Sequence, residues 1–297
     1  MKVIPVTYHS KKYPSDINSC IDEIAGNLDK ESINPTREYS LHTEYSHMKR
    51  KLDSKLLSKY DQLKNCHKDF VPQLWKNKLW AEQFADFIIE IVGKNIPPKI
   101  IEIHPPFKDY CYNLDSFFEI YTIFEKKILK AFPNTLIFIE NRCGTFYKGG
   151  KFLISKGKEI IEFLSKLSEM QLRLKLVLDY PQVFSAELIK MDNVKLDKII
   201  KFNLDIKKYN NYIGGFHLWG KRKKTSNSRW VSHTGDLNDF FSNNDRLKEE
   251  FIKSIISTFD DDKLRFFVPE VNSSEEDLQS IITDLQKYGI IFVTSDT

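Results

Sequence analysis

Short apolar runs recur along the chain, separated by stretches whose apolar residues have a helical spacing. In one such stretch, Phe84, Phe87 and Ile91 are three and four residues apart, as on the buried face of a helix. The pattern predicts eight strands, at residues 3–8, 38–46, 99–107, 136–142, 172–180, 212–220, 264–271 and 290–296. It predicts seven helices, at residues 15–28, 77–93, 114–132, 157–170, 194–209, 245–259 and 274–289.

The regular alternation of strands and helices predicts a parallel sheet, because parallel strands need a long crossover that is usually helical. Strands that are apolar on both faces, such as residues 136–139, also indicate a covered parallel sheet. Eight repeats in 297 residues match a (β/α)₈ TIM barrel. An open doubly wound sheet is the competing arrangement, but no GxGxxG motif follows a strand. We expect one α/β TIM-barrel domain over residues 1–297, whose closing helix after the eighth strand is missing or replaced.

Six consecutive predicted strands end in a histidine, an aspartate or a glutamate. These residues are His42, His104, Glu140, Asp179, His217 and Glu270. All strand carboxyl ends of a parallel barrel open onto one mouth, so side chains that are distant in sequence meet there. Neutral imidazoles and carboxylates are ligands that Zn²⁺, Mn²⁺ and Fe²⁺ accept. Six such groups at one mouth are costly unless an ion satisfies them or they satisfy one another. The strand ends therefore predict a shared divalent-metal site.

Composition and charge narrow the possible partners and function classes only slightly. The chain is 41% apolar and 29% charged, with a net charge of +4 that permits a nucleic acid or phosphate partner without requiring one. No apolar run approaches the roughly 18 residues of a membrane span, and the N-terminus lacks a secretory signal. Four widely spaced cysteines, Cys20, Cys66, Cys111 and Cys143, predict free thiols. We expect a cytoplasmic protein with no membrane or protein partner.

The motifs at the strand ends occur in an order that carries a family resemblance. They are LHTEY at His42, IHPPF at His104, IEN at Glu140, LDY at Asp179, FHL at His217, PEV at Glu270 and SRWVSHTGDLNDFF around His233. From residue 38 onward, this order resembles the xylose-isomerase-like barrel superfamily of sugar isomerases and epimerases, endonuclease IV and the UV-damage endonucleases. The pattern is most similar to the nucleases, which are the second family of abasic-site endonucleases. The likeness rests on two histidines beyond the ligands shared with the isomerases, His42 and His104, and on a basic loop at residues 217–233.

The resemblance implies a ligand set for one or two ions of Zn, Mn or Fe. One ion would be held by Glu140, Asp179, His217 and Glu270, and a second by His42 and His104, with Glu140 bridging. Endonuclease IV has a histidine where this chain has Gln182 and an aspartate where it has Val231. A third metal site would therefore be incomplete, and His233 is expected to contact a substrate oxygen or phosphate instead.

The first functional hypothesis is a metal-dependent phosphodiesterase that cleaves DNA at abasic or damaged sites. Two metals about 3.5–4 Å apart would clamp the phosphate oxygens and acidify a water, which Glu140 or Glu270 would orient. Basic residues that would follow the DNA strand are Lys221, Arg222, Lys223, Lys224 and Arg229. Aromatic residues that would stack on bases are Tyr45, Phe146, Tyr147 and Trp219.

The second hypothesis is a sugar or sugar-phosphate isomerase or epimerase. One metal would bind adjacent sugar oxygens, and Glu140 and Glu270 would move the proton as an acid/base pair. His42, His104 and His233 would then bind substrate hydroxyls or phosphate. A third hypothesis is a barrel whose site has decayed into a binding module. The two extra histidines and the basic loop favour the nuclease.

Overall fold

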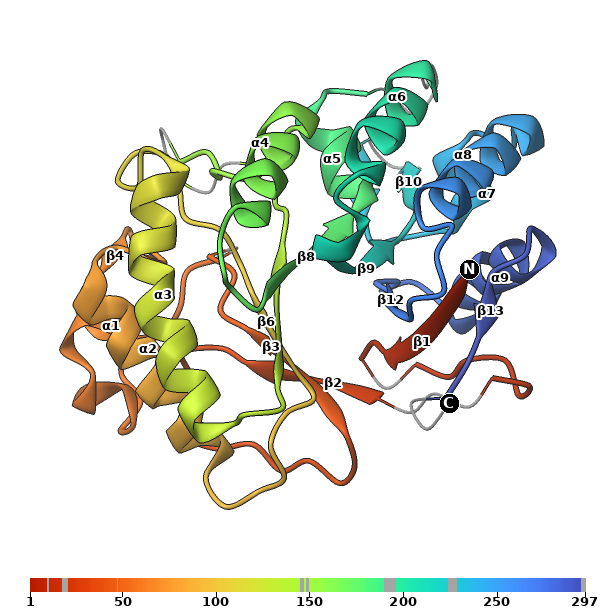
Figure 1. Ribbon diagram of the computed structural model, residues 1–297. Coiled ribbons are helices and arrows are strands. Elements are labelled where there is room, and N and C mark those ends of the chain that lie inside the picture. The colour runs from red at the N-terminus through yellow and green to blue at the C-terminus, as the bar shows by residue number, and fades with distance from the viewer. Residues whose placement is uncertain are drawn as a thin grey trace. The chain divides into compact units, whose positions relative to one another are not determined.

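In the computed structural model, eight parallel strands pair into one closed sheet, which confirms the predicted TIM-barrel class. Helices follow most of the later strands along the chain (Figure 1). The structure describes residues 1–9, 11–17, 21–46, 48–144, 147, 150–189, 196–223 and 229–294, so Cys20, Phe146 and Lys224 lie outside it. The barrel strands are β1 (Lys2–Thr7), β2 (Ile21–Gly26), β3 (Tyr39–Thr43), β6 (Ile100–Ile103), β7 (Leu136–Glu140), β8 (Leu174–Asp179), β9 (Ile213–Leu218) and β12 (Arg265–Pro269). They follow this order around the sheet, and β12 pairs with β1.

The chain forms two compact units, the first of Met1–Asp22 with Val177–Thr297 and the second of Glu23–Leu176. The second unit contains η1 (Leu57–Lys59), α1 (Asp61–Asn65), β4 (His67–Lys68), β5 (Val71–Pro72), α2 (Lys78–Val92), α3 (Leu114–Ala131) and α4 (Gly157–Ser168). Its long helices begin at side-chain caps, because Asn77 accepts from the Trp80 amide and Asn113 from the Ser116 amide. Helices α2 and α3 lie side by side (Figure 1).

An aromatic cluster fills the space between these helices and the strands of the second unit. Trp75 is fully buried and makes edge-on contacts with Trp80, Phe84, Phe117 and Phe124. Its indole nitrogen donates to the carbonyl of His104 at 2.6 Å. The packed core of this unit is thereby tied directly to the end of β6.

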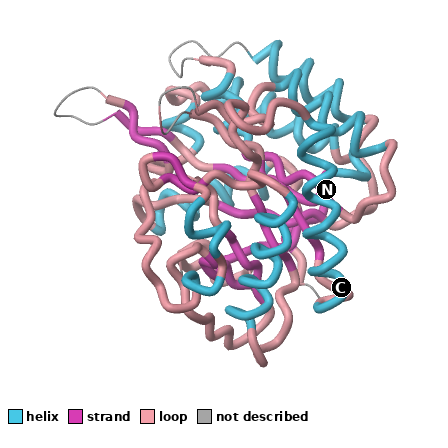
Figure 2. The backbone as a smooth tube through the Cα atoms, turned by 90° about the vertical axis from the view of Figure 1, so that its left-hand side faces the viewer, coloured by secondary structure: helices cyan, strands magenta, loops and turns pink. Residues whose placement is uncertain are grey.

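The first unit supplies the remaining helices and a hairpin outside the barrel. Its further elements are α5 (Tyr180–Ala186), α6 (Leu196–Lys207), η2 (Asn210–Tyr212), β10 (Lys221–Lys223), β11 (Trp230–Ser232), α7 (Leu237–Phe240), α8 (Asp245–Thr258), α9 (Glu275–Lys287) and β13 (Ile291–Phe292). Strands β10 and β11 pair antiparallel. The strands and helices are distinguished by colour in Figure 2.

Two expectations about the ends of the barrel were wrong. Residues 15–28 were predicted as a helix, but β2 lies there, because Ile21 and Asp22 pair with Val6 and Thr7 of β1. This tertiary pairing overrides a local spacing that also fits a helix. The expected eighth strand is the short β13, which pairs with the start of β1, and the eighth barrel strand is β12. Because α9 follows β12, a helix after the last barrel strand is present.

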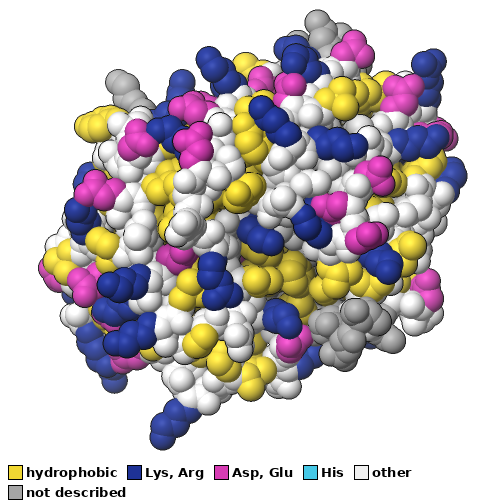
Figure 3. Space-filling view, in the orientation of Figure 1, with side chains coloured by type: hydrophobic (Ala, Val, Ile, Leu, Met, Phe, Trp, Pro, Cys, Tyr) yellow, Lys and Arg dark blue, Asp and Glu magenta, His cyan; other side chains and the backbone are white. Residues whose placement is uncertain are grey.

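The described residues also show the state of three thiols and the charges on one face of the surface. Among them, no helix is both long and apolar enough to cross a membrane. Cys66, Cys111 and Cys143 form no disulfide, as predicted. On the face shown in Figure 3, Lys and Arg side chains are interspersed with Asp and Glu. The prediction of a single domain over residues 1–297 stays a prediction.

Candidate metal centre

Three neighbouring strands of the second unit place four potential ligands together. Residues two apart in a strand face the same side, so Glu102 and His104 share one face at the end of β6. The register places His42 of β3 beside Glu102, and Ile103 beside Ile139 of β7. The next step along both strands brings His104 to Glu140. The sheet register therefore gathers His42, Glu102, His104 and Glu140.

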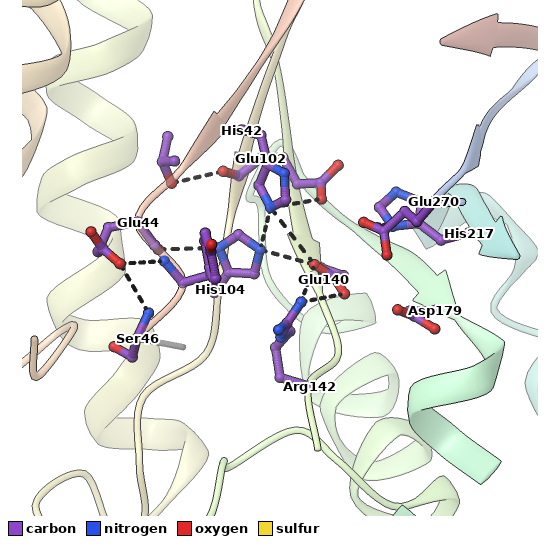
Figure 4. A network of polar contacts seen from close by, with 12 residues as sticks. His42, Glu44, Ser46, Glu102, His104, Glu140, Arg142, Asp179, His217 and Glu270 are labelled. Atoms are coloured by element: carbon purple, nitrogen blue, oxygen red, sulfur yellow. Dashed lines mark hydrogen bonds and ion pairs between the residues drawn. The ribbon is translucent and has the colours of Figure 1, made fainter. Parts of the chain in front are cut away.

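Both histidines use one ring nitrogen for support and direct the other toward this group (Figure 4). Nδ1 of His104 lies 3.1 Å from the carbonyl oxygen of Glu44, and Nδ1 of His42 lies 3.2 Å from Oε1 of Glu23. A carbonyl can only accept, so Nδ1 of His104 donates, and the Nε2 of a neutral His104 carries a lone pair. The two Nε2 atoms are 2.9 Å apart, and Nε2 of His104 is 2.9 Å from Oε2 of Glu140.

The donor set fits a divalent cation. One ligand atom from each of His42, Glu102, His104 and Glu140 lies within 4.8 Å of the others. Glu140 and His104 are fully buried, and Glu102 is 3% exposed. A lone pair on His104 facing the Glu140 carboxylate at 2.9 Å is repulsive unless a positive charge lies near both atoms. Two imidazoles and two carboxylates are ligands of Zn²⁺, Mn²⁺ and Fe²⁺.

The pKa values of the two histidines differ in direction. Burial lowers the pKa of His42, but Glu23, Glu102 and Glu140 outweigh it and raise this pKa to about 9. The pKa of His104 is lowered, because its burial outweighs the attraction of Glu140. Without a metal, His42 is therefore the charged ring, and its Nε2–H donates to the lone pair of His104.

The Glu44 side chain fixes the backbone segment whose carbonyl oxygen bonds to His104. The side chain of Glu44 is fully buried and accepts from Nε of Arg50 at 2.9 Å. It also accepts from the backbone amides of Leu28, Tyr45 and Ser46 at 3.1–3.3 Å. These bonds fix the segment after β3, where the carbonyl oxygen of Glu44 accepts a hydrogen bond from Nδ1 of His104.

Arg142 and Tyr45 lie next to the same group. Nη1 of Arg142 is 3.2 Å from Oε1 of Glu140, and Arg142 is buried. The guanidinium groups of Arg142 and Arg50 lie over the Tyr45 ring, 5.4 and 5.1 Å from its centroid. The Tyr45 ring is 5.6 Å from that of His42. The predicted role of Tyr45 in stacking on a substrate stays a prediction.

The first unit holds the other three predicted ligands, Asp179, His217 and Glu270. All three are buried, and one ligand atom of each lies within 4.8 Å of the others. Nδ1 of His217 is 3.3 Å from Oε1 of Glu270. Asp179 caps α5 by accepting from the Gln182 amide at 2.9 Å, and its other oxygen accepts from Nε1 of Trp219 at 2.9 Å. The carboxylate of Asp179 is thus held in one orientation.

His233 and Trp219 support this second group. The His233 ring stacks on Trp219 with centroids 4.1 Å apart, and its Nδ1 lies 3.1 Å from the carbonyl oxygen of Glu270. Trp219 is 1% exposed, and its indole nitrogen already bonds to Asp179. The roles of His233 and Trp219 in substrate binding stay predictions.

The basic loop is partly neutralised within the first unit. Arg222 forms ion pairs with Asp239 at 2.6 Å and Asp277 at 2.8 Å. Lys221 donates a hydrogen bond to the Ser185 hydroxyl. Arg229 is exposed. The contacts that we expect between a substrate and Lys221, Arg222 and Arg229 stay predictions.

Several residues of the second unit were missed in the sequence. Glu102 could have been found, because it is two residues before His104 and shares its face of the strand. Glu23 was hidden by the helix predicted at residues 15–28. Glu44, Arg50 and Arg142 carry no spacing signal, because they lie outside the barrel strands.

Comparisons with known proteins give only distant likenesses. No family model matches the chain, and no curated protein matches its sequence. A probable 3-DHS dehydratase AsbF involved in petrobactin synthesis, from Bacillus anthracis, aligns with a TM-score of 0.44 and 11% identity over 84% of this chain and 77% of that one. A xylose isomerase domain protein from Planctomyces limnophilus has a TM-score of 0.41 and 10% identity over 90% and 95% of the two chains. A structure described as AsfvAP:AG has a TM-score of 0.42 and 12% identity over 85% and 74%. With TM-scores below 0.5, these likenesses support no functional argument.

Proposed function

We propose that the protein is a divalent-metal-dependent phosphodiesterase whose metal centre includes His42, His104 and Glu140. The observation that carries this proposal is the orientation of the two imidazoles. Each uses Nδ1 for a supporting bond and directs Nε2 at the other and at Glu140. Supported histidines of this kind are typical of metal sites.

A divalent ion, when bound, supplies a Lewis acid for a phosphate oxygen and lowers the pKa of a water. The chain's own groups have separate tasks. Glu140 acts as ligand and as the carboxylate that orients the attacking water, and Arg142 balances its negative charge at 3.2 Å. Glu44 and Glu23 keep the two rings oriented.

We propose that Asp179, His217 and Glu270 serve the same reaction, with Glu140 as a shared ligand and Glu270 as a second catalytic carboxylate. The order of the sheet supports this, because β7, β8, β9 and β12 are consecutive and parallel strands end at one mouth. The family resemblance of the motifs assigns the same four residues to one ion.

Abasic or damaged DNA is the substrate we propose first, because the two histidines beyond the shared ligand set favour the nucleases. A sugar or sugar-phosphate isomerase or epimerase is the second candidate. It gains support from Arg222, whose charge is already paired with Asp239 and Asp277 rather than available to a DNA strand.

The test is metal-dependent cleavage. The protein would be stripped with a chelator, reloaded with Zn²⁺, Mn²⁺ or Fe²⁺ and incubated with abasic, nicked and intact duplex DNA and with a simple phosphodiester. We expect cleavage that requires the ion and falls at least about 100-fold in Glu140→Gln, as when a charge-stabilising group is lost. Glu125→Gln, a buried carboxylate bonded to Tyr121, is the matched control. Absence of cleavage together with proton exchange into a ketose would establish the second candidate instead.

A further inference from the structure

A phenylalanine occupies the tight turn between β4 and β5. Lys68 pairs with Val71 across the two antiparallel strands, so Asp69 and Phe70 form a two-residue turn. Their φ angles are 52° and 66°, as in a type I′ turn, whose second position favours glycine. A bulky side chain at positive φ is a strained exception. The turn would therefore form more easily with glycine in place of Phe70.

Phe70 is also poorly buried. It is 56% exposed, although phenylalanine is among the side chains that burial stabilises most. Phe70 thus combines backbone strain with an exposed apolar ring, and a glycine would avoid both. Strain of this kind is concentrated at sites that bind a ligand or carry out chemistry. The turn is therefore a candidate binding site.

His67 fixes the orientation of the Phe70 ring. The two rings are nearly parallel, with an angle of 9° between their planes and centroids 5.2 Å apart. The Phe70 amide donates to Nδ1 of His67 at 3.3 Å, which holds the imidazole in register with the turn. A planar ring supported in this way is preorganised to stack against another planar group.

The hairpin is joined to the segment that supports the candidate metal centre. The Arg50 amide donates to the carbonyl of Phe70 at 2.9 Å, and the Ser46 hydroxyl donates to a carbonyl of β5 at 2.6 Å. Arg50 and Ser46 both bond to the Glu44 side chain, and the Glu44 carbonyl supports His104. Phe70 is therefore held by the same segment that orients a proposed metal ligand.

Positive charge accompanies the ring. Lys49 and Lys51, on either side of Arg50, are exposed. Lys68 beside the turn is exposed as well and pairs with Asp109 at 3.8 Å. Ammonium groups attract a phosphate backbone, and an aromatic ring stacks on a base of any identity. Exposed lysines beside an exposed ring are the combination that single-stranded nucleic acid requires.

We infer that Phe70 is a stacking platform for a nucleobase, so that the β4–β5 turn is a binding site for a DNA strand. The inference rests on the proposed function, because it names a residue that holds the strand away from the reacting phosphate. The hairpin belongs to the loop between β3 and α2, and loops after strand carboxyl ends form the mouth of a parallel barrel. Stacking on Phe70 would be independent of base sequence.

Fluorescein-labelled oligothymidine is the probe, and chelator-treated protein keeps binding separate from cleavage. We expect Phe70→Gly to weaken binding at least about fivefold, as for the loss of one stacked base. Phe70→Tyr, which keeps an aromatic ring, should bind within about twofold of the wild type. The control is Tyr112→Ala, which removes a 76% exposed aromatic ring elsewhere in the second unit and should bind as the wild type does. Phe70→Asn, which also tolerates positive φ, serves if Phe70→Gly does not fold.

Ultraviolet crosslinking gives a second measurement, because light joins a thymine to an aromatic ring on which it stacks. We expect the crosslink on the peptide that contains Phe70. Equal affinity of Phe70→Gly and the wild type, or an equal loss in Tyr112→Ala, overturns the inference. So does a wild-type dimer that Phe70→Gly dissociates in sedimentation, since the ring would then join two copies of the chain. Metal-dependent cleavage of abasic DNA would leave the proposed function standing in each case, whereas a wild type that neither binds nor cleaves DNA contradicts both.

Discussion

At the scale of single residues, the candidate centre depends on which nitrogen of each histidine faces inward. His104 is held by a backbone carbonyl and His42 by the carboxylate of Glu23. Burial keeps the pKa of His104 low, whereas the burial of His42 is outweighed by the carboxylate of Glu23 and its neighbours, which favour the charged form. The two rings therefore enter metal binding in different protonation states.

The charge on His42 is open to measurement in chelator-treated protein. The pKa of His42 in the folded protein, about 9, is above the ordinary value of about 6.5. The stability that the charged His42 contributes is therefore fully present below pH 6.5 and is lost as pH rises through about 9. We expect the His42 resonance to titrate near 9 by NMR, and Glu23→Gln to lower this pKa. A titration of His42 close to 6.5 in the wild type would contradict the arrangement.

Glu44 should matter for both stability and metal binding. Leaving one member of a buried ion pair alone costs about 3–5 kcal/mol, so Glu44→Gln, which strands Arg50, should lower the free energy of unfolding by about that amount. Urea denaturation measures it. The double variant Glu44→Gln with Arg50→Met should lose less than the sum of the single variants. Equal and additive losses would show that the two side chains do not act as a pair.

At the scale of elements, β10 carries Lys221, Arg222 and Lys223, and its partner β11 leads to His233. Arg222 pairs this hairpin with Asp239 of α7 and with Asp277 of α9. The pair is partly exposed, so its contribution is modest, on the order of 1 kcal/mol. The effect of the Arg222 ion pairs should therefore be larger on local opening of the β10–β11 hairpin than on the free energy of global unfolding.

Arg222→Gln should speed hydrogen exchange at the amides of Trp230–Ser232 several-fold, because the hairpin loses its anchor. Lys198→Gln, which removes an exposed charge on α6, is the control and should leave exchange unchanged. Faster exchange in both variants would indicate a general effect of charge.

The close approach of β9 and β12 gives a second element-scale prediction. A Cβ on Gly215 would lie 2.3 Å from the carbonyl oxygen of Phe266, its partner across the pair. Because the obstacle is backbone, it cannot rotate away. We expect Gly215→Ala to lower the free energy of unfolding by at least about 1–3 kcal/mol in urea denaturation. A variant as stable as the wild type would mean that the strands are further apart.

Elements with strong periodicity were predictable, and those shaped by pairing were not. Helix α2 and strand β7 follow directly from apolar spacing, and the strand ends gave His42, His104 and Glu140. Strand β2 did not, because its residues also fit a helix until β1 pairs with them. Glu44 and Arg50 meet only through the fold of the segment after β3.

At the scale of the whole molecule, a bound metal should stabilise the protein. A ligand at 100 times its dissociation constant adds about 2.7 kcal/mol, and each kcal/mol raises the Tm by about 2–4 °C for proteins of 150–250 residues. We expect Zn²⁺ to raise the Tm of chelator-treated protein by several degrees in a thermal scan. The same ion should have a smaller effect on His104→Ala. Equal shifts in both proteins would place the stabilising ion elsewhere.

The pairing of β1 with β12 and β13 sets a condition on folding. Val3 pairs with Arg265 and with Phe292, so the first strand finds these neighbours only late in synthesis. Contacts between such distant parts of a chain form slowly, because a long loop must close first. During synthesis, the apolar strand β1 must therefore be kept from aggregating until β12 and β13 have left the ribosome. This makes β1 a natural client for a chaperone.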